Sequence, residues 1–316
     1  MNTPMTVKTE ILKVPGASIY YEVRGSGPVL LMMPGGPADA GAFRRIAGYL
    51  ESDYTVVTYD PRGLSHSPLD TPVNDERIVQ IFADDAHRLL SATTTEPAFV
   101  FGSSGGAVIA LELVARHSDQ VRTLVPHEPP APALLPDPAR ERATMEEIVQ
   151  TYRTAGIGPA MQKFMVQTGI RSGPPPPPPG EPTPEMREGM EQMKRNMDFW
   201  LGHYFLAISA YEPDFDALKA GSSRIVPGVG KESRGELANE GGLELARRLG
   251  TEAVVFPGAH GGFDSNAPEF AIKLHEVLAS KRQRGENSCS RQRRRSAVFR
   301  STTWRRRRLS IRIPWV

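Results

Sequence analysis

Residues 99–108 read FVFGSSGGAV, and this stretch decides the fold. An apolar run ends in two serines set among glycines, and a helix-forming segment follows directly. The letters fit the pattern G-x-S-x-G with Ser104 at its centre, in the strand-turn-helix setting that the pattern requires. Glycines two residues to either side remove side chains that would collide at so sharp a turn. The pattern predicts that Ser104 is an exposed nucleophile and that the register excludes its neighbour Ser103; a plain glycine-rich turn is the alternative.

Short β-forming runs alternate with helix-length segments along most of the chain. The runs are 18–23, 28–34, 54–60, 98–102, 121–127, 224–230 and 252–258, and helical patterns cover 41–50, 75–92, 105–117, 236–249 and 267–280. Such alternation predicts an α/β fold with a mainly parallel sheet and helices on both faces. Ligands of such sheets bind at the carboxyl ends of the strands, which is where Ser104 is expected.

The alternation stops between residues 129 and 221, where prolines cluster and no strand pattern is visible. We expect a helical lid over 129–221, inserted between two parts of a core, 1–128 and 222–280. A six-proline run at 174–179 is interpreted as an exposed linker within the lid. Beyond it, methionines recur at helical spacing at Met186, Met190, Met193 and Met197. Two interpretations of this methionine stripe are open: it fills a core, or it forms a soft apolar wall over a substrate pocket.

Charge is distributed unevenly along the chain. Residues 281–316 hold 13 of the 38 lysines and arginines and a single acid, so the net charge of +2 balances a tail at +12 against a body at −10. The acidic body argues against nucleic acid as the main ligand, although the basic tail can bind phosphates non-specifically. Without a packing pattern, the tail is predicted to be disordered, or to be a foreign or out-of-frame terminus.

The sequence also indicates the cellular location of the protein, through its apolar stretches, its N-terminus and its cysteine content. No apolar stretch is long enough to cross a bilayer, and we see no secretory signal at the N-terminus. The single cysteine, Cys289, has no partner within the chain, which favours a reducing, cytoplasmic location. We therefore expect a small-molecule substrate and no membrane partner, and the sequence leaves the oligomeric state open.

A serine hydroxyl is a poor nucleophile and needs a general base, for which the chain offers seven histidines. Six lie in or at the end of helical patterns, in the lid, in the loop after the third strand or at a strand end: His66, His87, His117, His127, His203 and His275. His260 differs, because it follows the last strand in a glycine-flanked loop, PGAHGGF, at the edge of the sheet expected for Ser104. We predict that His260 is the base.

The base in turn needs a carboxylate that fixes its tautomer and stabilises the imidazolium. Glu232 follows the penultimate strand and precedes His260 by 28 residues, which leaves room for one helix and one strand. Glu128, in VPHEPP, also ends a strand. We expect Glu232 to be the acid, with Glu128 as the alternative.

Two backbone N–H groups are needed for an oxyanion. The first is predicted at Gly105, directly after the nucleophile. The second is predicted in the loop MPGGPADAG, where Pro37 has no N–H and Gly36 is therefore the better candidate. A tight strand-exit loop without this role is the alternative interpretation.

Over roughly residues 7–280, these features resemble the α/β-hydrolase superfamily. The resemblance rests on PGGP, DPRGLSHS, GSSGG and PGAHGGF in that order. PGGP is similar to the HGGP of proline iminopeptidases and related esterases, with Pro34 in place of histidine. DPRGLSHS is similar to the family's D-x-R-G-x-G-x-S, with Ser65 replacing a glycine, and the resemblance implies that this loop shapes the site. Relatives that open epoxides or remove halides carry aspartate at the position of Ser104. This position lies in the sharp turn between strand and helix, called the elbow, so Ser104 argues against those activities.

The expected function is that of a serine hydrolase that cleaves a small, fairly apolar ester through an acyl-enzyme. No metal or organic cofactor is implied. Hydrolysis of amides or peptides, of the proline-iminopeptidase type, is one alternative, and a ligand-binding protein of this fold without catalysis is another.

Overall fold

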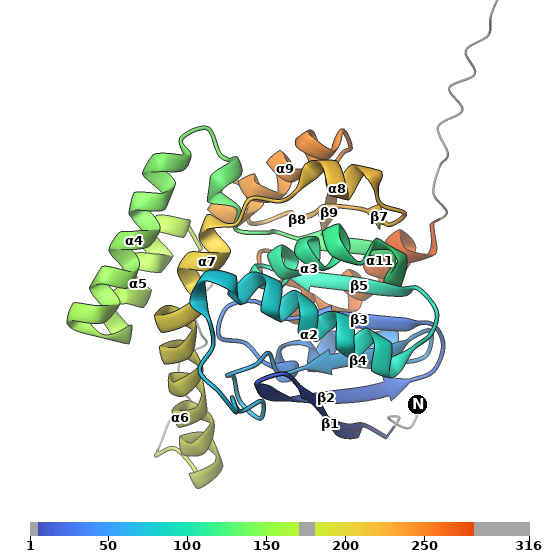
Figure 1. Cartoon of the computed structure of the whole chain (residues 1–316), viewed down its shortest axis with the longest axis horizontal. Helices are drawn as coiled ribbons and strands as arrows, with labels where there is room; N and C mark the ends of the chain where they lie inside the picture. The colour runs from blue at the N-terminus through green and yellow to red at the C-terminus, as the bar shows by residue number, and fades with distance from the viewer. Residues whose placement is uncertain (1–5, 171–180, 281–316) are drawn as a thin grey trace, which may run out of the picture. The chain divides into compact units, whose positions relative to one another are not determined.

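A nine-stranded sheet runs through the part of the chain that the structure, a computed structural model, describes, residues 6–170 and 181–280 (Figure 1). The strands are β1 (Lys8–Val14), β2 (Ala17–Gly25), β3 (Val29–Met33), β4 (Thr55–Tyr59), β5 (Ala98–Ser103), β6 (Val121–His127), β7 (Arg224–Ile225), β8 (Gly228–Gly230) and β9 (Val254–Phe256). Their order is β1-β2-β4-β3-β5-β6-β8-β9, with β7 beside β6. β1 and β2 are antiparallel, and β3 to β9 are parallel. The predicted α/β class is confirmed.

Two strand predictions need correction. β1 was not expected, because its KTEILKV sequence interleaves charges with apolar residues on an edge strand that is mostly exposed. The run 224–230 was expected to be one strand but forms two, β7 and β8. Pro227 lies between them and has no N–H to give to a ladder.

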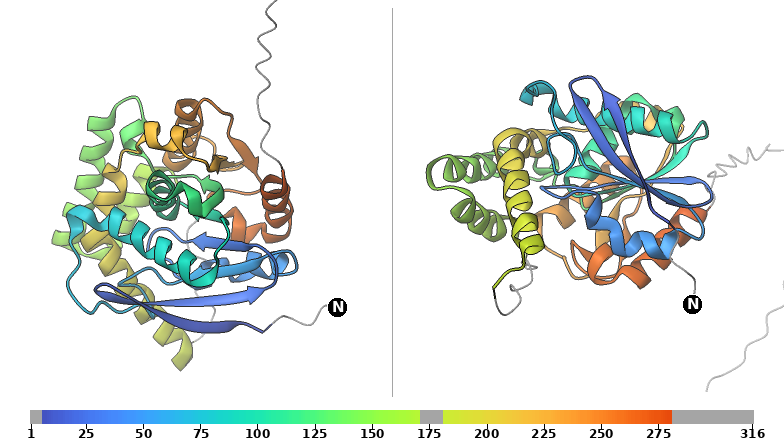
Figure 2. Two further views of the ribbon diagram at one scale, coloured as in Figure 1. Left: turned by 45° about the vertical axis from the view of Figure 1, so that its right-hand side comes forward. Right: turned by 90° about the horizontal axis from the view of Figure 1, so that it is seen from below.

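Helices cover both faces of the sheet. They are α1 (Arg44–Leu50), α2 (Ile78–Thr93), α3 (Gly105–Arg116), α4 (Pro138–Ala155), α5 (Ile157–Thr168), α6 (Pro184–Phe199), α7 (Phe205–Ala210), α8 (Phe215–Ala220), α9 (Leu237–Leu249), α10 (Gly262–Ser265) and α11 (Ala267–Ala279). Figure 2 shows α1 and α11 on the face opposite α2 and α3. In β3, Leu31 belongs to the core under α2 and α3, and its neighbour Leu30 belongs to the core under α1 and α11. Because both faces are covered, β3 is apolar throughout.

The carboxyl ends of the central strands are tied to one another beyond the regular ladder. The Ser104 N–H donates to the His127 carbonyl at 2.9 Å, and the Glu128 N–H donates to the Gly228 carbonyl at 2.9 Å. The residues that follow β5 and β6 are therefore held beside the end of β6 and the start of β8.

The segment between β6 and β7 contains helices and no strand among its described residues. α4 and α5 form an antiparallel pair at one side of the molecule, and α6 continues through a π-helical turn, Trp200–Tyr204, into α7 (Figure 1). α8 packs against α3 and α9, on the body of the protein. We call α4 to α7, with the π-helical turn, the lid.

Both interpretations of the methionine stripe are wrong. Met190 and Met193 are 61% and 41% exposed, and α6 buries only Asn196. The aromatic residues that follow the stripe behave differently, because Trp200 and Phe205 are buried. The apolar residues at helical spacing thus predicted helix α6 correctly, but they did not predict which face of α6 is buried.

Several predictions lie outside the described residues: the six-proline run 174–179, the single cysteine and the basic tail 281–316. Within the described residues, no helix combines the length and the apolar character needed to cross a membrane.

Candidate active site

The turn after β5, which was predicted to be sharp, has a strained backbone. Ser104 has φ 55° and ψ −125° and directly precedes α3. A Cβ on Gly106 would lie 2.2 Å from the Met33 carbonyl oxygen, and one on Gly102 would lie 2.7 Å from the Gly106 carbonyl oxygen. Only glycine fits at either position, as the sequence pattern implied. Ser103, by contrast, is buried within β5 and pairs with His127.

Ser104 is one of a few residues with a strained backbone conformation. Of the described residues, three that are not glycine have positive φ: Ser65, Ser104 and Glu128. Such conformations raise the free energy by about 1–3 kcal/mol each and persist where the surroundings hold them. One of the three is the predicted nucleophile and another is a candidate acid.

His260 and Glu128 form a direct pair. His260 Nδ1 lies 2.6 Å from Glu128 Oε2, and the carboxylate is fully buried while the imidazole is 17% exposed. The other oxygen, Oε1, accepts hydrogen bonds from Gly230 N–H, the Ser233 hydroxyl and Asn239 Nδ2. A carboxylate that accepts from four donors is held in one orientation and leaves Nε2 of the imidazole free to face a substrate.

These donors also keep Glu128 ionised. Burial by itself raises the pKa of this carboxyl, but the hydrogen bond with His260, the nearby histidine charges and the Ser233 hydroxyl outweigh burial and lower the pKa to about 2. Glu128 is therefore an anion at neutral pH, which is the state that stabilises a neighbouring imidazolium.

The expectation that Glu232 is the acid is not supported, and the alternative, Glu128, occupies that position instead. The Glu232 side chain is exposed, and its backbone N–H donates to the Gly258 carbonyl at 3.0 Å. This bond fixes the turn after β8 so that the next residue, Ser233, is the one that reaches Glu128. The signal for Glu128 was its position directly after the strand beside β5; nothing in the sequence indicated Ser233 or Asn239.

The remaining histidines have other environments. His127 is fully buried against Phe256 and Phe270, and neither ring nitrogen has a hydrogen-bond partner among the described residues. Burial lowers the pKa of His127 to about 4, against the opposing effect of the neighbouring Glu128 charge. The other five contact partners away from Ser104: His66, His87, His117, His203 and His275.

The two glycines predicted for the oxyanion lie next to each other. Gly36, with φ 59°, places its nitrogen 3.6 Å from the point where a Cβ of Gly105 would be. Gly35 fits its loop directly against the elbow, because a Cβ there would lie 2.5 Å from the Ser103 carbonyl oxygen. Within the described chain, we find no acceptor for the N–H of Gly36 or of Gly105. Both groups are free for a ligand oxygen.

A cavity of about 40 Å³ lies between Ser104, His260 and the lid. Its lining residues are Ser104, Pro130, Met145, Phe164, Thr168, Ile170, Trp200, Phe205, Ile208, Ser209, Leu237, Ala238 and His260. The two lid hydroxyls are already used, since Thr168 and Ser209 donate to carbonyls of their own helices. A larger and more open groove of about 690 Å³ lies elsewhere on the surface and contains neither Ser104 nor His260. The small cavity, with no Asp, Glu, Lys or Arg in its lining, is the one that contains the nucleophile.

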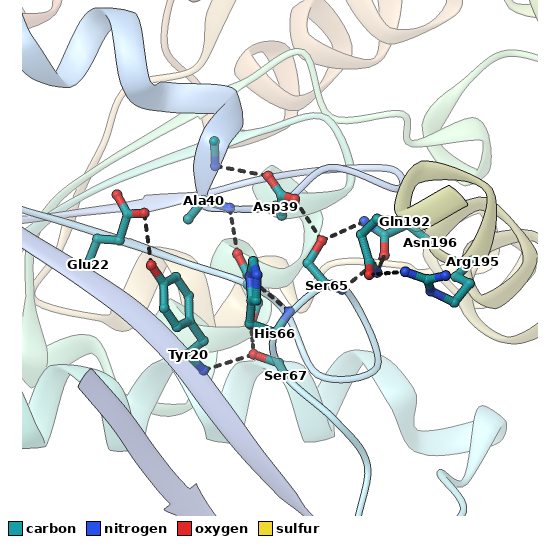
Figure 3. A network of polar contacts seen from close by, with 12 residues as sticks. Tyr20, Glu22, Asp39, Ala40, Ser65, His66, Ser67, Gln192, Arg195 and Asn196 are labelled. Atoms are coloured by element: carbon teal, nitrogen blue, oxygen red, sulfur yellow. Dashed lines mark hydrogen bonds and ion pairs between the residues drawn. The ribbon is translucent and has the colours of Figure 1, made fainter. Parts of the chain in front are cut away.

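The loop DPRGLSHS is held by Asp60, as the resemblance implied for a loop that shapes the site. Asp60 Oδ1 accepts from the Ala40 N–H at 2.9 Å, and Oδ2 accepts from the His66 N–H at 2.9 Å. Figure 3 shows Ala40, His66 and Ser67 around this carboxylate. Ser67 donates to the Asp60 carbonyl at 2.7 Å. The carboxylate thus joins the loop after β4 to the loop after β3.

No group of three or more His, Cys, Asp or Glu side chains able to hold a metal ion occurs in residues 6–170 and 181–280.

Known proteins are similar to this chain in sequence and in fold. The sequence model of the alpha/beta hydrolase fold matches residues 28–160. The uncharacterized hydrolase YraK of Bacillus subtilis (strain 168) is 37% identical over 287 residues, which are 88% of this chain and 99% of that protein. The chain belongs to the α/β hydrolase family.

Two further comparisons are less extensive. The zearalenone hydrolase of Cladophialophora bantiana is 30% identical over 129 residues, 40% of this chain and 49% of that protein. The structure of a thermophilic esterase from Thermogutta terrifontis superimposes with a TM-score of 0.64 at 19% identity, covering 85% of this chain and 98% of that one. At that identity, the superposition establishes the fold alone.

Proposed function

We propose that this protein is a serine hydrolase of small, uncharged carboxylic esters. The observation that carries the proposal is the buried Glu128–His260 pair beside a cavity that His260 and the strained Ser104 both line. Such a pair activates a serine hydroxyl, because the imidazole accepts the proton and the carboxylate stabilises the resulting cation.

The reaction follows from these groups. Ser104 Oγ attacks the acyl carbon while His260 takes the hydroxyl proton, and the N–H groups of Gly36 and Gly105 bind the oxyanion. The ester C–O bond then breaks, and His260 returns the proton to the leaving alcohol. Water, deprotonated by His260, then attacks the acyl-enzyme. The bond between the acyl carbon and Ser104 Oγ breaks, the acid leaves, and His260 returns the proton to Ser104 Oγ.

The lining of the cavity favours an ester over a peptide. An N-terminal ammonium group in a closed site requires a carboxylate partner, and the lining contains no Asp or Glu. The volume of about 40 Å³ corresponds to roughly three water molecules, at about 10–15 Å³ for each. Both facts support an uncharged ester with a short acyl chain.

A substitution at the nucleophile tests the proposal. Ser104→Ala is expected to lower kcat/KM for p-nitrophenyl acetate by about 10³-fold or more and to abolish labelling by a fluorophosphonate. Ser103→Ala is the matched control and should keep both. Equal hydrolysis by the parent and Ser104→Ala proteins would refute the proposal.

A series of substrates tests the specificity. Rates should be highest for acetyl to butyryl esters and should fall for octanoyl esters and for the corresponding p-nitroanilides. A faster reaction with amino-acyl p-nitroanilides would favour the peptidase alternative. Absence of both labelling and turnover in the parent would favour the ligand-binding alternative.

A further inference from the structure

Two lid side chains hold consecutive carbonyl groups of the loop that carries Gly36. The Tyr204 hydroxyl, from the π-helical turn, donates to the Gly36 carbonyl. Asn196 Nδ2, from α6, donates to the Pro37 carbonyl at 3.0 Å. Neither Asn196 nor Tyr204 lines the cavity, so neither contacts a substrate bound there.

The side-chain amide of Asn196 makes four hydrogen bonds at the junction, the place where α6 meets the loops after β3 and β4. Its amide oxygen accepts from the Ser65 N–H at 2.9 Å and from Gln192 Nε2 at 3.0 Å (Figure 3). Its amide nitrogen donates to the Pro37 carbonyl and to Ser65 Oγ. The Ser65 N–H can only donate and the Pro37 carbonyl can only accept, which determines the orientation of the amide. Asn196 is 1% exposed and is the one buried residue of α6.

The same junction holds the third strained residue. Ser65, with φ 45°, donates through its hydroxyl to Asp39 Oδ2 at 2.7 Å while it accepts from Asn196. A chain of hydrogen bonds therefore runs from the lid through Ser65 to the far end of the loop that carries Gly36. Ser65 stands where the family pattern has glycine, and its hydroxyl gives this chain of bonds a group that glycine lacks.

Near Gly36, one backbone hydrogen bond also restrains the loop, because the Ala38 N–H donates to the Gly35 carbonyl at 3.3 Å. Gly35 fits tightly against the elbow, whereas a Cβ on Gly36 would meet nothing within 4 Å. Glycines on both sides of the Gly35–Gly36 peptide plane allow it to rotate if this turn loosens, and rotation would turn the Gly36 N–H away from the Gly105 N–H. The Tyr204 and Asn196 bonds restrain the two peptide planes that follow the Gly36 nitrogen.

We propose that Asn196 and Tyr204 are positioning residues, through which the docked lid keeps the Gly36 N–H aimed at the oxyanion. The inference rests on the proposed function, because it assigns these residues to the same reaction. It adds a role for the lid: the lid encloses the acyl group and also completes the geometry of the oxyanion site.

The test compares Tyr204→Phe and Asn196→Asp with Tyr152→Phe. Tyr152 is a matched lid tyrosine, whose hydroxyl bonds Asp198 Oδ1 at 3.1 Å and does not contact the Gly36 loop. For p-nitrophenyl acetate, both test variants are expected to lower kcat by about 10–100-fold with KM unchanged within about two-fold. The inhibition constant of a methyl trifluoromethyl ketone, which forms an oxyanion on Ser104, should rise by the same factor. Tyr152→Phe should leave all three quantities at the parent values.

The outcomes separate the inference from a structural role. Tyr204→Phe leaves the ring contacts with Phe82 and Phe199 in place, so it decides the matter if Asn196→Asp does not fold. Parental kcat and ketone inhibition in Tyr204→Phe would overturn the inference, as would an equal loss in Tyr152→Phe. If Ser104→Ala is as active as the parent, the proposed function fails; if Ser104→Ala is inactive and Tyr204→Phe is normal, only the inference fails.

Discussion

Two glutamates follow strands at the same edge of the sheet, yet their surroundings differ in every respect that matters for catalysis. Glu128, after β6, is fully buried, has φ 47° and accepts four hydrogen bonds, one of them from His260. Glu232, after β8, is exposed. The comparison teaches that position after a strand brings a carboxylate to the correct edge, while the path of the next few residues decides whether it turns inward.

The largest difference is expected in activity. Glu128→Gln keeps the size of the side chain but removes the charge that orients and stabilises the imidazolium, so kcat/KM should fall by about 10³–10⁴-fold. Glu232→Gln should change it by less than about two-fold, as expected for an exposed group. Ester hydrolysis by the two purified variants, with circular dichroism as the folding control, makes the comparison. Equal losses of kcat/KM in the two variants would indicate that Glu232 also takes part in catalysis.

The two carboxylates should also differ in their effect on acid stability. The folded-state pKa of Glu128 is lowered from 4.5 to about 2, so the stability it contributes is present above pH 4.5 and is lost as the pH falls toward 2. The loss amounts to about 3 kcal/mol. Urea unfolding between pH 5 and 2.5 should show a shallower pH slope for Glu128→Gln than for the parent, whereas Glu232→Gln should keep the slope of the parent.

The support of Glu128 can be weakened without touching its charge. Ser233→Ala removes one donor to the buried carboxylate, and loss of a hydrogen bond to a charged group destabilises a fold by about 1.5–3 kcal/mol. The melting temperature should fall by about 3–9 °C. Ser52→Ala, at an exposed serine that bonds Asp53, is the control and should melt with the parent. A Ser233→Ala protein that melts like the parent would show that the remaining donors suffice.

The smallest effect is expected one residue before Glu128. Burial keeps His127 neutral, with a pKa of about 4 against an ordinary value of 6.5, so the unfolded chain takes up a proton below pH 6.5 and the folded chain does not. Stability is therefore lost as the pH falls from 6.5 toward 4, by about 1 kcal/mol at pH 5.5. His127→Phe should reduce the difference in unfolding free energy between pH 7 and pH 5.5. An unchanged difference would place the proton uptake on another group.

Much of the body could be predicted because its signals are local. The segments 105–117 and 236–249 correspond to α3 and α9, since helical periodicity and the glycines that flank them lie within the same short windows. The placement of Ser104 followed from the G-x-S-x-G pattern, which records two different steric demands. The collisions at Gly102 are local, with Gly106 and Ala107, whereas the collision at Gly106 is with Met33 on the neighbouring strand β3.

The acid and the lid contacts could not be predicted in this way. Glu128 and Glu232 have similar local contexts, and the choice between them depends on the split at Pro227 and on the bond from Glu232 N–H to the Gly258 carbonyl. Asn196 reaches Ser65 across 131 positions of sequence. Its neighbours on α6 suggested an apolar face, whereas the buried contact of that helix is an amide.

By itself, the sequence determined the fold class, the nucleophile turn and the histidine loop, because strand and helix periodicity and the G-x-S-x-G pattern can be recognised within a few consecutive residues. Only the tertiary structure decided which carboxylate meets His260 and which lid residues hold the Gly36 loop. Those pairings join segments that are distant in the chain, and a hydrogen bond forms only where packing brings donor and acceptor within about 3 Å.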